Sequence, residues 1–75
     1  MTAVLDVRGL PPCEPFERIL AALDALPAGQ TLEALLAREP LPLFAWLGDN
    51  GFGWEGDHLR LDGQPCYRIV IRRAA

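Results

Sequence analysis

The alternation of apolar and polar residues is strictest near the end of the chain, from Cys66 to Arg72. There Tyr67, Ile69 and Ile71 share one side while their neighbours share the other, which is typical of a strand with one covered face. A shorter apolar stretch, Ala3 to Val7, predicts another strand near the start of the chain. We expect both strands to turn their apolar side chains toward a core.

The segment 52–61 alternates less regularly, with glycines between its aromatic residues and charged residues between its leucines. Glycine weakens the interior of a strand, so we expect a strand that is interrupted near Gly56, an interruption that a bulge would explain. Asp62 and Gly63 follow, and this pair is typical of a two-residue hairpin turn. The last two strands are therefore expected to form a hairpin.

Helical spacing is clearest after Pro15. Five apolar residues recur there at intervals of three and four: Phe16, Ile19, Leu20, Leu23 and Leu26. Pro15 suits the first turn of this helix, and Pro27 to Gly29 are expected to end it. Glu14 and Arg18 lie four residues apart in the order that favours an ion pair.

The segment Thr31 to Ala37 fits two patterns, because its leucines can share one face of a helix or alternate as in a buried strand. Residue propensity favours a helix, whereas the short distance to Pro40 favours a strand. A second helix is expected from Leu43 to Leu47, ended by Gly48 or Gly51. With the ambiguous segment as a strand, the order is strand, helix, strand, helix, strand, strand.

This order predicts an α+β fold, in the form of a two-layer α/β sandwich with the pattern βαβαββ. Two helices would cover one face of a four-stranded mixed sheet, and the other face would be open to solvent. A chain of 75 residues has room for one core, so we expect a single domain over residues 1–75.

The charge and the cysteines narrow the classes of function. A net charge of -3 argues against a nucleic-acid interface, which is normally basic. Cys13 and Cys66 are far apart and have no metal-binding spacing, so no metal site is expected. No signal peptide or apolar span of about 20 residues is evident, which predicts a cytoplasmic protein with no membrane partner and with reduced thiols.

Residues 5–16, LDVRGLPPCEPF, contain the most distinctive chemistry. Gly9 predicts a turn, and the prolines prevent a helix until Pro15 can open one. Cys13 would then lie at the start of a helix, where backbone N–H groups and the helix dipole favour a thiolate or another anion. The alternative is that Cys13 is a small, inert residue in a tight loop.

The stretch LDVRGL, the Cys/Pro cluster and the amphipathic helix after it resemble the TusA/SirA-like sulfur carriers. The signature of that family is a strand, an RGL-like turn and a CPxP motif at the first helix. Glu14 and Pro15 match the last two positions of CPxP, and the segments PAGQTL and PCYRIVIRR are also similar. The resemblance covers nearly the whole chain and is closest to a proline-rich branch of uncharacterised domains.

The resemblance implies that the last strand is antiparallel and inserted beside the second, and that Thr31 to Ala37 is a strand. It also implies that the motif cysteine takes a persulfide sulfur from a cysteine desulfurase and hands it to a sulfur acceptor. The sequence departs from the family by one position. When Leu5 to Leu10 are aligned, the family cysteine corresponds to Pro12, and Cys13 corresponds to the first proline of CPxP.

Two hypotheses of function are consistent with these features. The first is a sulfur carrier that uses Cys13 as its persulfide site, within a motif made of Arg8, Gly9, Pro12, Glu14 and Pro15. The second is a non-catalytic module that binds a ligand or a protein through the motif loop and the open sheet face. On that face, Arg68 and Arg72 would form a patch that binds an anion or a partner protein. The alternative is that the two arginines only make the face soluble in water.

Other chemistry has little support in the sequence. No Ser/His/Asp set, paired carboxylate site or nucleotide loop can be assembled, so a carrier or binding protein is expected rather than a stand-alone enzyme, with no cofactor. His58 has no evident partner and is expected at the surface, and Cys66 is expected to be structural. The aromatic residues are expected in the core: Phe44, Trp46, Phe52 and Trp54.

Overall fold

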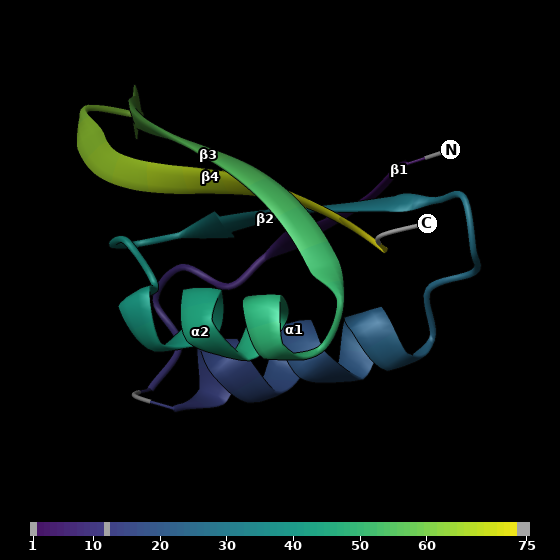
Figure 1. Cartoon of the computed structure of the whole chain (residues 1–75). Coiled ribbons are helices and arrows are strands. Elements are labelled where there is room, and N and C mark those ends of the chain that lie inside the picture. The colour runs from purple at the N-terminus through teal and green to yellow at the C-terminus, as the bar shows by residue number, and fades with distance from the viewer. Residues whose placement is uncertain (1, 12, 74–75) are drawn as a thin grey trace.

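The computed structural model describes residues 2–11 and 13–73. It contains two helices and four strands: β1 (Thr2–Asp6), α1 (Glu14–Asp24), β2 (Thr31–Leu36), α2 (Leu41–Asp49), β3 (Phe52–Leu61) and β4 (Gln64–Arg73). Both helices lie on the same side of the sheet (Figure 1). The predicted α+β fold with the order βαβαββ is therefore confirmed.

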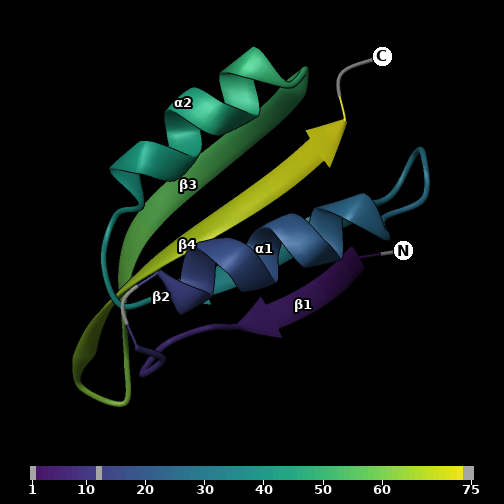
Figure 2. The same ribbon diagram turned by 90° about the horizontal axis from the view of Figure 1, so that it is seen from below.

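The four strands form one mixed sheet in the order β1-β2-β4-β3. β1 is parallel to β2, and β4 is antiparallel to both β2 and β3. In the helical layer, α1 packs on β2 and α2 packs on β3 (Figure 2). The last strand is thus inserted beside the second, as the resemblance implied.

The ambiguous segment is a strand, β2, despite its helix-favouring composition. Leu32, Ala34 and Leu36 are buried, whereas the residues between them are only partly covered. β2 has a hydrogen-bonded strand on each side and helices over one face. Burial in the centre of the sheet therefore outweighs the weak local preference for helix.

β4 shows the predicted division between its two faces. Tyr67, Ile69 and Ile71 are buried beneath the helices, and Arg72 on the other face is exposed. Cys66 belongs by alternation to the face of Arg72, yet only 3% of it is exposed. The alternation therefore predicts the direction of these side chains better than it predicts their burial at the end of the strand.

The predicted interruption of β3 at Gly56 is wrong. The pairing of β3 with β4 is one to one from Phe52 to Leu61, with no extra residue. A Cβ atom at position 56 would overlap the ring and hydroxyl of Tyr67. Gly56 is therefore where an aromatic ring of β4 lies against the backbone of β3, which is another reason for glycine in a strand.

The hairpin between β3 and β4 turns at the predicted residues. Asp62 and Gly63 both have positive φ angles, 53° and 77°. Two such residues form the type I′ turn, whose twist matches that of paired strands.

The helices differ from the predicted ranges at their ends. α1 ends at Asp24, before the expected stop at Pro27 to Gly29. α2 begins at Leu41, two residues before the expected start, so that Pro42 lies in its first turn. A proline is compatible with that turn because the N–H it lacks would have no partner within the helix.

The aromatic residues other than Tyr67 line the edge of the core rather than its centre. All of them are partly exposed, and four pack in pairs: Phe44 stacks on Trp54 at 5.6 Å, and Trp46 stacks on Phe52 at 5.7 Å. Neither helix in the described part of the chain is long and apolar enough to cross a membrane.

Candidate functional site

The loops that follow β1 and β2 leave the sheet at the same edge, because these strands are parallel neighbours. α1 and α2 therefore both begin at that edge (Figure 1). A groove of about 830 Å³ lies there. Its lining includes Leu10, Cys13, Phe16, Arg38, Pro40 and Leu43. The predicted motif thus forms one wall of a groove whose other wall is the connection between β2 and α2.

Cys13 is the N-cap residue of α1, and it is exposed at the groove. Its φ of 74° lies in the left-handed region, which costs about 1–2 kcal/mol for a residue with a Cβ atom. The turn is closed by the N–H of Glu14, which donates to the carbonyl of Pro11 at 3.2 Å. The cysteine side chain makes no capping hydrogen bond, so its sulfur is not held by the helix.

The start of α1 offers fewer N–H groups than the sequence suggested. The N–H of Glu14 is used in the turn, Pro15 has none, and the N–H of Glu17 donates to the carbonyl of Cys13 at 3.2 Å. The Glu17 bond is the ordinary first bond of a helix, so it is Glu14 and Pro15, two of the first three helical positions, that have no N–H available for an anion. Two carboxylates, Glu14 and Glu17, also lie in this first turn.

The side chain of Arg8 is bonded to Asp6 and not to the thiol of Cys13. Its Nε donates to Oδ1 of Asp6 at 2.9 Å and its Nη2 donates to Oδ2 at 2.7 Å, while its backbone N–H donates to Oδ1 at 3.1 Å. These bonds lower the pKa of the Asp6 carboxyl from 3.8 to about 2 and raise the pKa of Arg8. The pair fixes the start of the loop.

The remaining motif residues shape this loop. Gly9 has a φ of 79°, which favours glycine at the turn. Pro15 lies in the first turn of α1, and Glu14 accepts a hydrogen bond from Arg18 at 2.9 Å, as predicted. Pro12, the position aligned with the family cysteine, lies outside the described residues.

Arg68 and Arg72 lie on the open face of the sheet and do not join the Cys13 groove. Arg68 donates to Glu33 at 2.9 Å and lies 3.8 Å from a carboxylate oxygen of Asp57. The bond to Glu33 raises the pKa of Arg68. Arg72 is exposed and extends beside Gly53. The structure thus separates the two groups of predicted site residues.

His58 has a carboxylate partner that the sequence did not reveal. Its Nε2 lies 3.3 Å from Oε1 of Glu39, and its ring meets Tyr67 edge-on at 4.9 Å. Glu39 also lines the Cys13 groove, so this pair borders the candidate site. The imidazole is largely exposed, as predicted for a surface residue.

The two cysteines have opposite environments. Both are free thiols, but Cys66 is buried and its Sγ lies 3.8 Å from its neighbour's carbonyl oxygen, whereas Cys13 is exposed. Cys13 is thus the thiol that a second protein can reach. Within residues 2–11 and 13–73, no group of three or more side chains could hold a metal ion.

Comparison with known proteins identifies a family but no function. Neither the curated proteins nor the solved structures include a significant match to this chain. A family model with the description "Uncharacterized conserved protein (DUF2249)" matches residues 4–73. That range contains both helices, the groove and nearly all of the sheet. The chain therefore belongs to the DUF2249 family.

Proposed function

We propose that the protein is a small sulfur carrier of the TusA/SirA-like type, which accepts a sulfur atom on Cys13 and passes it to a partner protein. The observation that carries the proposal is the position of Cys13. Its thiol is exposed at the start of α1 and beside a groove of about 830 Å³, with no hydrogen bond to its own helix.

The transfer needs no cofactor. The Cys13 thiolate attacks the outer sulfur of a persulfide on a cysteine desulfurase, and a bond forms between the two sulfur atoms. The S–S bond of the donor breaks, and its electron pair leaves on the donor cysteine as a thiolate. The proton of the Cys13 thiol passes to solvent. Delivery to the acceptor repeats the exchange, with Cys13 as the leaving thiolate.

The surrounding residues would present the thiol rather than activate it. The Asp6–Arg8 pair and the turn at Gly9 fix the loop, and the left-handed backbone turns Cys13 outward. Arg8 is bonded to Asp6, and two of the first three helical positions have no N–H available for an anion. Activation would therefore come from the active site of the partner. The exchange requires the reducing conditions of a cytoplasm, where an exposed thiol stays free.

The second candidate function is a non-catalytic module that binds a protein segment in the same groove. The observation in its favour is that Arg8, the cation within the motif, donates to the Asp6 carboxylate through Nε and Nη2 and is therefore already paired. In this hypothesis Cys13 contributes only to the shape of the groove.

Sulfur loading distinguishes the two functions. The protein is incubated with a cysteine desulfurase and L-cysteine, and its intact mass is measured without reductant. The carrier hypothesis predicts the addition of one sulfur, which is lost in Cys13→Ser and kept in Cys66→Ala. A wild-type protein that binds the desulfurase but gains no sulfur would favour the binding module.

Limited alkylation gives the matched chemical control. Cys13 should react before Cys66 because only the first is exposed in the folded protein. Cys66 should react only after urea is added. Equal labelling of the two cysteines in the folded protein would contradict the arrangement on which the proposal depends.

A further inference from the structure

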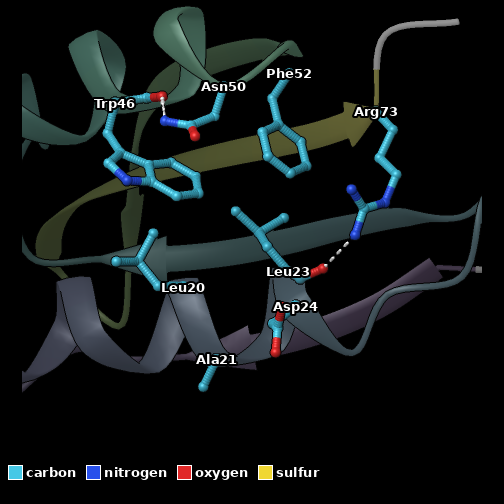
Figure 3. Close-up of a pocket in the computed structure, with 8 residues that line it drawn as sticks. All are labelled: Leu20, Ala21, Leu23, Asp24, Trp46, Asn50, Phe52 and Arg73. Atoms are coloured by element: carbon cyan, nitrogen blue, oxygen red, sulfur yellow. Dashed lines mark hydrogen bonds between the residues drawn. The ribbon is translucent and has the colours of Figure 1, made fainter.

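A second hollow lies between α1 and α2, near the C-terminal ends of both helices (Figure 3). Its volume is about 520 Å³, within the range of small-molecule sites. Its lining includes Leu20, Leu23, Trp46, Asn50, Phe52 and Arg73. It shares no residue with the Cys13 groove, so its binding properties are independent of the proposed function.

The sides of this inter-helix cleft are apolar. Trp46 and Phe52 lie on one side, and Leu20 and Leu23 of α1 lie on the other (Figure 3). The two aromatic rings are stacked with their planes 23° apart. Trp46, Phe52 and Leu20 are each only partly buried, although they pack against the core. A ring-sized apolar body placed here would remove this remaining surface from water.

One end of the cleft is closed by a fixed cation. Nη2 of Arg73 donates to the carbonyl of Leu23 at 3.0 Å, and Nε donates to the carbonyl of Leu26 at 3.4 Å. The guanidinium also lies 5.2 Å from the centre of the Phe52 ring. Nη1 has no hydrogen bond to any described residue, and Figure 3 shows this nitrogen directed toward Phe52. The donor is therefore pre-oriented for an acceptor inside the cleft.

Two further polar groups border the cleft. The Asn50 side chain donates to the carbonyl of Trp46 at 2.8 Å, which fixes its amide and leaves the amide oxygen as an acceptor. Asp24 adds a carboxylate, but Figure 3 shows its side chain directed toward Ala21 and away from Arg73. Arg73 is thus the cation in the lining of this cleft, beside the carbonyl of Leu23, and the Asp24 carboxylate belongs to the same lining.

We propose that this cleft binds a small carboxylic acid whose body is apolar and about the size of one ring. The body lies between Trp46 and Leu20, and the carboxylate accepts a charge-assisted hydrogen bond from Nη1 of Arg73. The chemistry selects a free acid over a neutral amide of the same shape, because the guanidinium supplies only donors and a positive charge.

The first test compares 3-phenylpropionate with 3-phenylpropionamide on the wild-type protein labelled with ¹⁵N. The acid should shift the indole N–H of Trp46 and the side-chain amide of Asn50 in a saturable way, with a Kd of about 1 mM. The amide should bind about tenfold more weakly. The proposal is refuted if the acid causes no saturable shift, or if acid and amide bind equally well.

The second test uses a neighbouring arginine as the control. Arg73→Gln should abolish the preference for the acid, whereas Arg72→Gln should keep it because Arg72 faces the other side of the sheet. Circular dichroism would check that both variants are folded. Should Arg73→Gln unfold the chain, the wild-type comparison of acid and amide still decides. An unchanged preference in a folded Arg73→Gln protein would overturn the assignment of Arg73.

Discussion

Replacement of Gly56 by alanine tests the contact between β3 and β4 most sharply. The added methyl would overlap the ring and hydroxyl of Tyr67, a residue that is only 7% exposed. The ring has little room to move, because it also packs against Phe44 at 6.0 Å and His58 at 4.9 Å. Overpacking of this kind costs about 1–3 kcal/mol, and disturbed ring contacts cost about 1 kcal/mol more.

Alanine also has an advantage over glycine, about 0.5–1 kcal/mol, because it loses less backbone entropy on folding. The net expectation is that Gly56→Ala lowers the free energy of unfolding by about 2 kcal/mol. In a domain of this size that corresponds to a fall in Tm of about 8–16 °C. Equilibrium unfolding in urea, followed by circular dichroism, measures the change.

Gly53→Ala is the matched control in the same strand. Its new methyl would lie 3.6 Å from the guanidinium of Arg72, which is ordinary contact with a flexible side chain. We expect Gly53→Ala to leave the free energy of unfolding unchanged or to raise it by up to about 1 kcal/mol, because the same backbone-entropy advantage of alanine is not opposed by a clash. In a Tyr67→Ala background the effect of Gly56→Ala should vanish or reverse. Equal effects of the two glycine substitutions would show that Gly56 is not required by the Tyr67 ring.

The remaining predictions concern the sheet and the loop. Ile71→Ala removes side-chain atoms from a fully buried position and should lower the free energy of unfolding by about 2–5 kcal/mol, whereas Arg72→Ala should lower it by at most about 0.5 kcal/mol. Similar losses for the two variants in urea unfolding would mean that the faces of β4 are misassigned. The pKa of Asp6 should be about 2 in wild type and higher in Arg8→Gln by NMR titration, yet still below 3.8, because the backbone N–H of residue 8 continues to donate to Oδ1. Because the pKa of Asp6 is lower in the folded protein, the stabilisation from this pair is complete above pH 3.8 and is lost as the pH falls through about 2. An Asp6 pKa that is the same in Arg8→Gln as in wild type would exclude the side chain of Arg8 as the cause.

The order of the elements could be predicted because the signals are local. The apolar alternation of β4 and the turn at Asp62 and Gly63 depend on neighbouring residues alone. Other features depend on partners that are distant in the sequence. β2 is a strand because of its place in the sheet, and Gly56 is explained by Tyr67 rather than by a bulge.

In the candidate site, too, some features could be predicted from neighbouring residues and others depend on distant ones. Arg8, Gly9 and Cys13 are close together in the sequence, so their common loop could be predicted. The use of the helix N–H groups depends on the turn that Pro11 and Glu14 close, which composition does not show. The Glu39 partner of His58 and the inter-helix cleft arise only when separate elements meet in space.

The most direct test of the central claim is the state of Cys13 in the cell. The protein is isolated without oxygen in the presence of an alkylating reagent that traps persulfides, and the peptide with Cys13 is analysed by mass spectrometry. A sulfur carrier should yield a fraction of this peptide with one additional sulfur between Cys13 and the alkyl group, and none on Cys66. Recovery of Cys13 only as a plain alkylated thiol, from an extract in which the desulfurase persulfide is trapped, would contradict the proposal.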